Sequence, residues 1–139
     1  MGNNGYAGHV VILEYDKNFR ALLEQELSYV GLGVHLPESE REALATIREL
    51  SETTKGISFV SDYTNKRDDR YGVRAAEKIR EEFPHVHVLC VTGYGSRSLY
   101  AIPHEDQRKF HYLHEKRSLL FEDPVFWLTV INPNGRNGQ

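Results

Sequence analysis

The sequence is poor in several residue types and patterns that would indicate a secreted or membrane protein. It has one cysteine, Cys90, among 139 residues, which excludes an internal disulfide and fits a reducing compartment. No apolar run approaches the roughly 20 residues of a membrane-spanning helix. The first residues, MGNNGYAGH, lack the apolar core of a signal peptide. We therefore expect a cytoplasmic protein with no membrane partner.

An excess of positive charge is also missing. The chain has 17 Lys and Arg against 20 Asp and Glu, so its formal net charge is −3. Proteins that bind nucleic acid neutralise phosphates with clusters of Lys and Arg, and we find no such stripe here. Direct nucleic-acid binding is therefore not expected. The length suits one domain over residues 1–139, with an ordered core over about residues 9–132 and short flexible termini.

Five short apolar runs predict strands. Continuous runs such as Val10 to Leu13 are typical of strands that are covered on both faces, as in a parallel sheet. Similar runs follow at intervals that leave room for a helix between them. The predicted strands cover residues 10–13, 34–36, 57–62, 86–92 and 110–114.

The segments between these runs mostly show helical spacing of apolar residues. Ser39 and Glu42 form the S-x-x-E pattern of a capping box at the start of the second helix. The region after the fourth strand should hold a helix, although Pro103 makes its pattern the weakest in the chain. Asp123 and Pro124 suit the start of a last helix. The predicted helices cover residues 18–30, 40–50, 72–83, part of 93–109, and 124–131.

Strands that alternate with helices predict an α/β fold with a parallel sheet. Right-handed crossovers and the small size favour a flavodoxin-like, doubly wound three-layer sandwich with strand order 2-1-3-4-5. In such folds ligands bind beyond the carboxyl ends of the strands, where the winding reverses between the first and third strands. The residues at those strand ends are therefore the candidates for function.

Acidic side chains and a hydroxyl follow these strands. Glu14-Tyr15-Asp16 follow the first strand, Asp62 ends the third, and Thr92 ends the fourth. Glu115, Lys116 and Arg117 come just after the fifth. Carboxylates are ligands that Mg²⁺ prefers, and an Asp carboxylate can attack phosphorus. A hydroxyl and an ammonium group can hydrogen-bond phosphoryl oxygens. This edge of the sheet therefore has the parts for phosphoryl chemistry.

With these residues at its strand ends, the chain resembles the receiver domain of response regulators, the signalling proteins of two-component systems. The resemblance covers residues 10–131 and is most specific in VVILEYDKNFRALL, FVSD and GVRAAEKIREEFPHVHVLCVTGYG. It implies a phosphorelay in which Asp62 accepts a phosphoryl group from a histidine kinase or a phosphotransfer protein. It also implies that the modified domain contacts a downstream protein target.

The resemblance implies roles for further residues. Thr92 matches the hydroxyl that reorients towards the phosphoryl group, and Tyr112 resembles the aromatic that swings inward with it. Lys116 is the candidate for the lysine that reads the phosphate. Mg²⁺ would be held by Glu14, Asp62 and the backbone carbonyl of Thr64.

The departures from the family pattern are specific. Tyr15 stands where a direct acidic metal ligand is expected, and Asp16 comes one residue late and should point elsewhere. Counting from Tyr112, Glu115 takes the lysine position, so Lys116 reaches the site only through a one-residue bulge or insertion. These changes keep the acceptor and weaken its chemistry.

Simpler interpretations remain open for each residue. Asp62 and Thr92 could be ordinary turn residues, Glu14 a solvated loop acid, Lys116 a surface lysine, and Tyr112 a packing residue. The seven histidines do not form a recognisable zinc motif, since no HExxH or cysteine partner accompanies them.

Three functions compete. The first is a phosphorylatable receiver, which is not an enzyme beyond self-phosphorylation and autodephosphorylation. The second is a pseudo-receiver, in which Tyr15 and Glu115 disable metal-assisted phosphorylation and the fold serves as an interaction or homodimerisation module. The third is a flavodoxin-like enzyme or nucleotide binder, which lacks a phosphate-binding glycine loop and a catalytic triad spacing.

Overall fold

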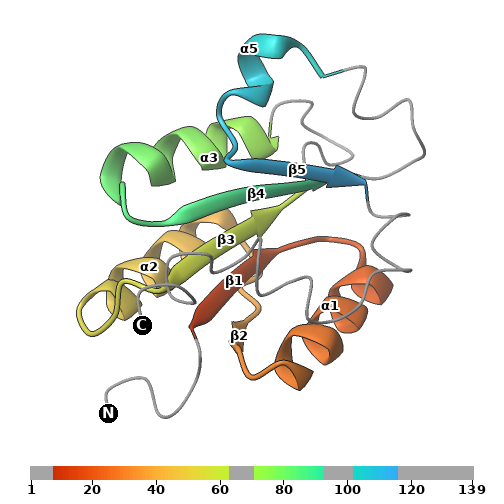
Figure 1. Cartoon of the computed structure of the whole chain (residues 1–139), viewed down its shortest axis with the longest axis vertical. Helices are drawn as coiled ribbons and strands as arrows, with labels where there is room; N and C mark the ends of the chain where they lie inside the picture. The colour runs from red at the N-terminus through yellow and green to blue at the C-terminus, as the bar shows by residue number, and fades with distance from the viewer. Residues whose placement is uncertain (1–7, 63–70, 93–101, 116–139) are drawn as a thin grey trace.

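A computed structural model describes residues 8–62, 71–92 and 102–115 of the chain. Strands and helices alternate through these residues (Figure 1). In chain order, the elements are β1 (His9–Leu13), α1 (Lys17–Tyr29), β2 (Gly33–His35), α2 (Glu40–Ser51), β3 (Ile57–Ser61), α3 (Tyr71–Glu82), β4 (His87–Thr92), α5 (His104–Gln107) and β5 (Tyr112–Glu115).

The strands form one five-stranded sheet in the order β2-β1-β3-β4-β5, and every neighbouring pair is parallel. This confirms the predicted flavodoxin-like fold and its strand order. The pairing β1–β3 runs from His9 beside Ile57 to Leu13 beside Ser61. Because the chain winds outward from β1 in one direction and from β3 in the other, the reversal point lies between these two strands.

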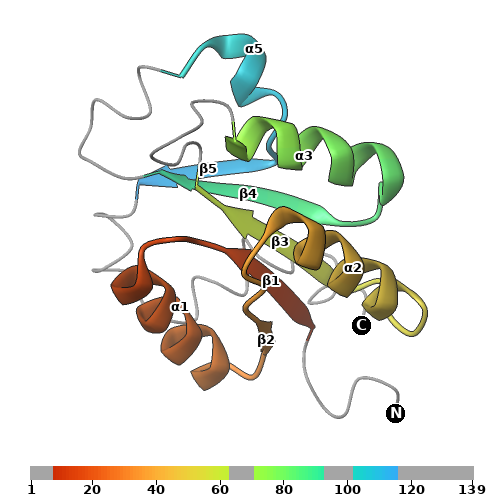
Figure 2. The same ribbon diagram turned by 180° about the vertical axis from the view of Figure 1, so that it is seen from behind.

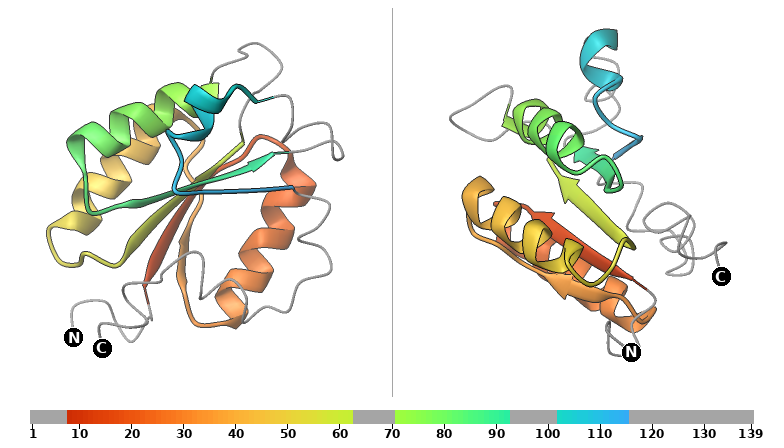
Figure 3. Two further views of the ribbon diagram at one scale, coloured as in Figure 1. Left: turned by 45° about the horizontal axis from the view of Figure 1, so that its top comes forward. Right: turned by 90° about the vertical axis from the view of Figure 1, so that its left-hand side faces the viewer.

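The helices cover the two faces of the sheet in separate layers. Helices α2 and α3 lie on one face, in front of the strands in Figure 2, and α1 lies on the other. Figure 3 shows the same layers edge-on, with the sheet between them. This explains why β1 is buried along its whole length, as the continuous apolar run predicted.

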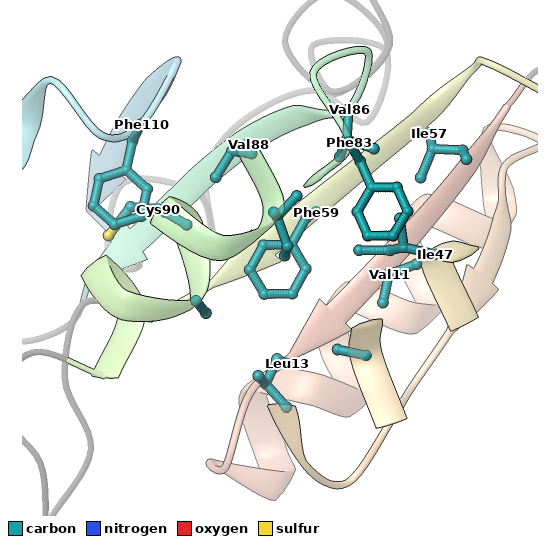
Figure 4. Packing of buried hydrophobic residues seen from close by; sticks show 14 of the residues in the cluster. Val11, Leu13, Ile47, Ile57, Phe59, Phe83, Val86, Val88, Cys90 and Phe110 are labelled. Carbon is teal, nitrogen blue, oxygen red and sulfur yellow. The ribbon is translucent and has the colours of Figure 1, made fainter. Parts of the chain in front are cut away.

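The larger core lies between the sheet and helices α2 and α3. Phe59 of β3 is fully buried at its centre, with Val88 and Cys90 on one side and Val11 and Ile47 on the other (Figure 4). Cys90 is a buried thiol within this cluster. Complete burial of a phenylalanine contributes about 1.5–3 kcal/mol relative to exposure, so this residue is a main support of the sheet.

A second core joins the opposite face of the sheet to α1. Alternate residues of each strand face the two cores, because strand side chains point to opposite faces in turn. Val10 and Ile12 of β1 therefore meet α1, whereas Val11 and Leu13 meet α2 and α3. The residues buried on this side are Val10, Ile12, Phe19, Leu23, Leu27, Leu32, Val60, Leu89 and Val91.

Polar side chains define where the first two helices begin. The Asp16 carboxylate accepts hydrogen bonds from the backbone amides of Asn18 (3.0 Å) and Phe19 (3.1 Å) at the start of α1. Ser39 caps α2 by accepting from the Glu42 amide at 3.1 Å, as the capping-box pattern predicted. The return bond differs from that prediction, because Glu42 accepts from the amide of Glu38 and not from that of Ser39.

The stretch around Pro103 is less helical than expected over its described part. Only His104–Gln107 is helical, with Pro103 immediately before it, since a proline fits the start of a helix and disrupts its interior. The fifth strand is Tyr112–Glu115, slightly later than residues 110–114. The predicted last helix over residues 124–131, and residues 93–101 of the weak helix, lie outside the described residues.

Within the three described segments, none of the helices has both the length and the apolar composition that crossing a bilayer requires.

Candidate functional site

The carboxyl ends of β1, β3 and β4 come together at the edge of the sheet where the winding reverses. Leu13 pairs with Ser61, and Ser61 pairs with Cys90 on the other side. Glu14 follows Leu13, and Asp62 follows Ser61. The two acidic residues therefore come directly after a paired position of β1 and β3. Neighbouring strands are about 4.8 Å apart, which places these two acidic residues within reach of one small ligand. We call this region the carboxyl edge.

Glu14 is a buried acid at the carboxyl edge. Its side chain is only 4% exposed, and its Oε2 accepts a hydrogen bond from the Asp16 amide at 3.0 Å. The interpretation of Glu14 as a solvated loop acid is therefore wrong. Burying a carboxylate is unfavourable unless hydrogen bonds or a partner compensate it, and the Asp16 amide supplies one such bond.

Asp16 does not contribute its carboxylate to the carboxyl edge. The same oxygen, Oδ1, accepts from the amides of Asn18 and Phe19, so the side chain is turned towards the start of α1. The prediction that Asp16 points elsewhere is thus confirmed. Its role is to satisfy two amides that a helix leaves without partners in its first turn.

Tyr15 lies between these two acids and is half exposed, at 51%. It occupies the position where the family resemblance implies an acidic metal ligand. A neutral phenol is a poor ligand for Mg²⁺, which prefers carboxylate, carbonyl and water oxygens. The three residues after β1 therefore supply one buried carboxylate to this edge.

Asp62 follows β3 directly and is partly buried. The residue before it, Ser61, is fully buried on the α2 and α3 side, and no hydrogen-bond partner for its hydroxyl lies among the described residues. Because strand side chains alternate, Asp62 leaves the strand towards the opposite side from Ser61. The backbone of β3 thus presents Asp62 next to Glu14 at the reversal point.

The structure describes only some of the other predicted site residues. The backbone of Thr92 ends β4 and pairs with Glu115 at the end of β5, so both reach the same edge of the sheet. Tyr112 pairs with Leu89, is partly buried against the α1-side core, and packs near the His114 ring at 5.8 Å. Lys116 and Thr64, the predicted phosphate and metal contacts, lie outside the described residues.

The described carboxylates do not complete a divalent-cation site. No group of three or more His, Cys, Asp or Glu residues within the described segments could hold a metal ion. Glu14 and Asp62 follow neighbouring strands, the Asp16 carboxylate caps α1, and Tyr15 is not a carboxylate. Mg²⁺ takes near-octahedral oxygen coordination and usually needs carboxylates together with waters or a bound phosphate. The described residues alone therefore do not supply a complete set of ligands for Mg²⁺.

Sequence reasoning missed a set of histidine contacts at the opposite, amino end of the sheet. The rings of His9 and His35 are joined by a hydrogen bond of 3.0 Å between Nδ1 and Nε2. His111 accepts from the Val88 amide at 2.8 Å through Nδ1, and its ring stacks on that of His87 with 4.8 Å between centroids. The available signal was that several histidines stand beside strand starts. A zinc motif is a local pattern, whereas these histidine contacts join residues that are far apart in the sequence.

Burial and neighbouring charges disfavour the protonated form of these histidines. Desolvation lowers the pKa of His9 and is also the main cause that lowers the pKa of His35, where the His9 ring adds to it and Glu49 opposes it. Desolvation and then the Arg80 guanidinium lower the pKa of His111, and a backbone hydrogen bond with Val88 acts in the opposite direction. Desolvation and then Lys55 lower the pKa of His85, whose ring is hydrogen-bonded to Ser51 at 2.9 Å.

Sequence comparisons found no protein-family model and no curated protein that matches the chain.

Comparison with solved structures gives a consistent result. The chain is similar to a response regulator receiver domain protein from Clostridium thermocellum, with 15% identity, a TM-score of 0.69, and 94% of this chain and 95% of the other covered. It is similar to the receiver domain of nitrogen regulatory protein C, with 19% identity, a TM-score of 0.65, and 96% and 98% covered. A third neighbour is the response regulator TrrA from Thermotoga maritima in complex with Mg²⁺-BeF, with 18% identity, a TM-score of 0.59, and 78% and 85% covered. The chain therefore has the fold of response-regulator receiver domains.

Proposed function

We propose that the chain is a receiver-type signalling module in which Asp62 accepts a phosphoryl group. The observation that carries this proposal is the pairing of Leu13 with Ser61, which brings Glu14 and Asp62 to the reversal point of the sheet. The similarity to receiver domains extends over most of this chain and most of each neighbour, and it supports the same function. A signalling role, not a catalytic one, follows from this proposal, and so does a cytoplasmic location beside a kinase.

The transfer itself requires only one nucleophilic oxygen. A carboxylate oxygen of Asp62 attacks the phosphorus of a phosphohistidine on a histidine kinase or phosphotransfer protein. The new P–O bond forms as the P–N bond breaks, and the leaving imidazole takes up a proton. The product is an acyl phosphate on Asp62, with a charge of about −1.5 to −2 near neutral pH. That charge beside the buried carboxylate of Glu14 biases the ends of β4 and β5 towards a second arrangement.

Output would pass through the outer part of the sheet. The ends of β4 and β5 are paired at Thr92 and Glu115, and β5 also carries Tyr112. In the proposal, the Thr92 hydroxyl and the Lys116 ammonium contact the phosphoryl group and Tyr112 follows the change. A downstream protein or a second copy of this chain would bind the altered surface.

A second candidate, the pseudo-receiver, is favoured by a specific observation. Asp16 is committed to the start of α1 and Tyr15 replaces an acid, so the carboxyl edge lacks part of the charge that would hold Mg²⁺. In this alternative the fold acts as a phosphorylation-independent interaction or dimerisation module. The two candidates differ in whether Asp62 can be modified at all.

Incubation with acetyl phosphate and Mg²⁺, followed by intact-mass measurement, separates them. Under the first proposal the wild-type chain gains the mass of one phosphoryl group, and Asp62→Asn gains none. Absence of labelling, under conditions that label an ordinary receiver domain in a parallel tube, would favour the pseudo-receiver.

The variant Tyr15→Asp tests the assignment of the metal position. An acid at residue 15 adds a hard ligand beside Glu14, so we expect a Mg²⁺ affinity at least about tenfold higher than that of wild type, equivalent to about 1.4 kcal/mol. Titration calorimetry with MgCl₂ measures it. Tyr15→Asn is the matched control, because it removes the ring without adding charge. Equal affinities for all three chains would contradict the assignment.

A further inference from the structure

The two edge strands of the sheet, β2 and β5, are each tied to an inner strand by an imidazole group. At β5, the residue just before the strand, His111, makes two hydrogen bonds to Val88 of β4. Its amide donates to the Val88 carbonyl at 2.7 Å, and its Nδ1 accepts from the Val88 amide at 2.8 Å. A backbone amide can only donate, so Nδ1 must carry no proton. This bond therefore exists only while His111 is neutral.

At the other edge, His35 of β2 and His9 of β1 share the hydrogen bond between their rings. His9 is 7% exposed, and His35 is partly buried. One of the two nitrogens donates and the other accepts, so at least one ring must be neutral. A first added proton leaves the bond intact, because an imidazolium can donate to a neutral imidazole. A second proton leaves two donors facing each other.

The charged groups around these rings act in different directions. The Glu49 carboxylate of α2 faces His35 and favours its protonated form, against the stronger effects of burial and of His9. The Arg80 guanidinium of α3 faces His111 and disfavours its protonation, and the stacked ring of His87 on β4 would add repulsion if it were charged as well. Each of the two rings thus has neighbours that act in both directions, and His111 is the more exposed to solvent.

We propose that the edges of this sheet are a proton-sensitive device, in which acidification releases β5 from β4 first and β2 from β1 second. The order follows because the His111 bond is lost with one proton, whereas the His9–His35 bond is lost only when a second proton enters a pair that already carries one positive charge. Two interacting titratable groups give two macroscopic steps that belong to the pair. The proposal does not depend on phosphorylation of Asp62.

Hydrogen exchange measured by NMR on the full chain tests the proposal. Protection factors, which correct for the pH dependence of intrinsic exchange, are compared at several pH values on both sides of the ordinary imidazole pKa of about 6.5. We expect protection of the Val88 amide and the β5 amides to fall by about fivefold or more on acidification, the size expected for loss of one hydrogen bond. The β2 amides follow at lower pH. The β3 amides report global unfolding and correct for it.

Two substitutions replace the titrating acceptors with side chains that do not titrate. His111→Asn puts an amide oxygen where Nδ1 stands, and His35→Gln puts an amide group where Nε2 stands. Each variant is expected to remove the acid-dependent loss of protection at its own edge only. His85→Gln is the matched control, because His85 bonds to Ser51 of α2 and belongs to neither edge, so it should leave both profiles unchanged.

Three outcomes would overturn the proposal. The first is edge protection that stays constant while the imidazole resonances titrate. The second is β2 opening at higher pH than β5. The third is a fall in protection that matches β3 throughout, because that would show only global unfolding. If His111→Asn does not fold, the wild-type order of the two edges still decides the question.

Discussion

The two ends of this sheet carry different kinds of side chain. At the carboxyl edge, Glu14 and Asp62 follow the paired strands β1 and β3, and Glu14 is buried. At the amino end, imidazole groups join β2 to β1 and β5 to β4. The first end is suited to a ligand that brings positive charge or phosphorus. The second is suited to remaining neutral. The length of a strand therefore separates the proposed phosphorylation site from the proposed pH-sensitive contacts.

The largest effect on stability should come from a substitution in the core that supports both ends of the sheet. Phe59→Ala removes the fully buried ring at the centre of β3, between α2 and α3. We expect a loss of about 3–5 kcal/mol in the free energy of unfolding, measured by urea denaturation. Phe59→Leu, which keeps most of the volume, is the control and should lose much less. A loss below about 1 kcal/mol for Phe59→Ala would mean that the two ends do not share one core.

The second largest effect should be a pH dependence of the free energy of unfolding, and it should come from the histidines and not from the carboxyl edge. The folded-state pKa values of His9, His35, His85 and His111 are lowered, so the folded chain binds fewer protons than the unfolded chain near these values. The stabilisation is full above the unfolded pKa of about 6.5 and is lost as pH falls through the folded values. Each hydrogen bond broken contributes about 1–3 kcal/mol.

Urea denaturation at stepped pH measures this dependence. The double variant His35→Gln with His111→Asn should flatten the curve below about pH 6.5. A wild-type free energy of unfolding that rises on acidification in this range would contradict the assigned pKa directions.

Much of the fold was predictable because it depends on local patterns. The continuous burial of β1 follows from the apolar run Val10 to Leu13, and the strand order follows from alternation and handedness. The start of α2 was visible in Ser39 and Glu42. The limits of α5 were not, because Pro103 could interrupt or begin a helix, and neighbouring segments decide which.

For the candidate site, the sequence predicted where the residues lie on the strands but not their burial or their contacts. The sequence indicated that Glu14 and Asp62 lie at strand ends, but not that Glu14 is buried or that it accepts the Asp16 amide. The His9–His35 contact joins residues 26 positions apart and depends on the exact register of β2 on β1. Such contacts follow from tertiary packing and leave no local pattern.

A smaller loss of stability should test whether Asp16 acts as the cap of α1. Asp16→Ala removes the acceptor for the Asn18 and Phe19 amides, so we expect a loss of about 1 kcal/mol in the free energy of unfolding. Asp16→Asn keeps an oxygen there and should lose only a few tenths. Mg²⁺ affinity, measured alongside by calorimetry, should not change in Asp16→Asn. A large drop in affinity would show that Asp16 belongs to the carboxyl edge after all.

The smallest effect should come from a contact that belongs to neither end. Arg48 of α2 forms an ion pair with Glu82 of α3, and both side chains are about half exposed. Exposed ion pairs of this kind contribute about 0–1 kcal/mol. We expect Arg48→Gln to lower the free energy of unfolding by less than about 1 kcal/mol and to leave its pH dependence unchanged. A larger loss would point to the contact of the guanidinium with the Phe83 ring.

The turn Glu14-Tyr15-Asp16 has a consequence for the resting protein. Several carboxylates crowded together repel one another and require a counterion before they can rest stably in one place. Here one acid is withdrawn to a helix start and another is replaced by a phenol, so that mutual repulsion is small. Under the proposed function, Asp62 would therefore stay accessible in a medium depleted of divalent salts, and the carboxyl edge would bind an arriving ion more weakly.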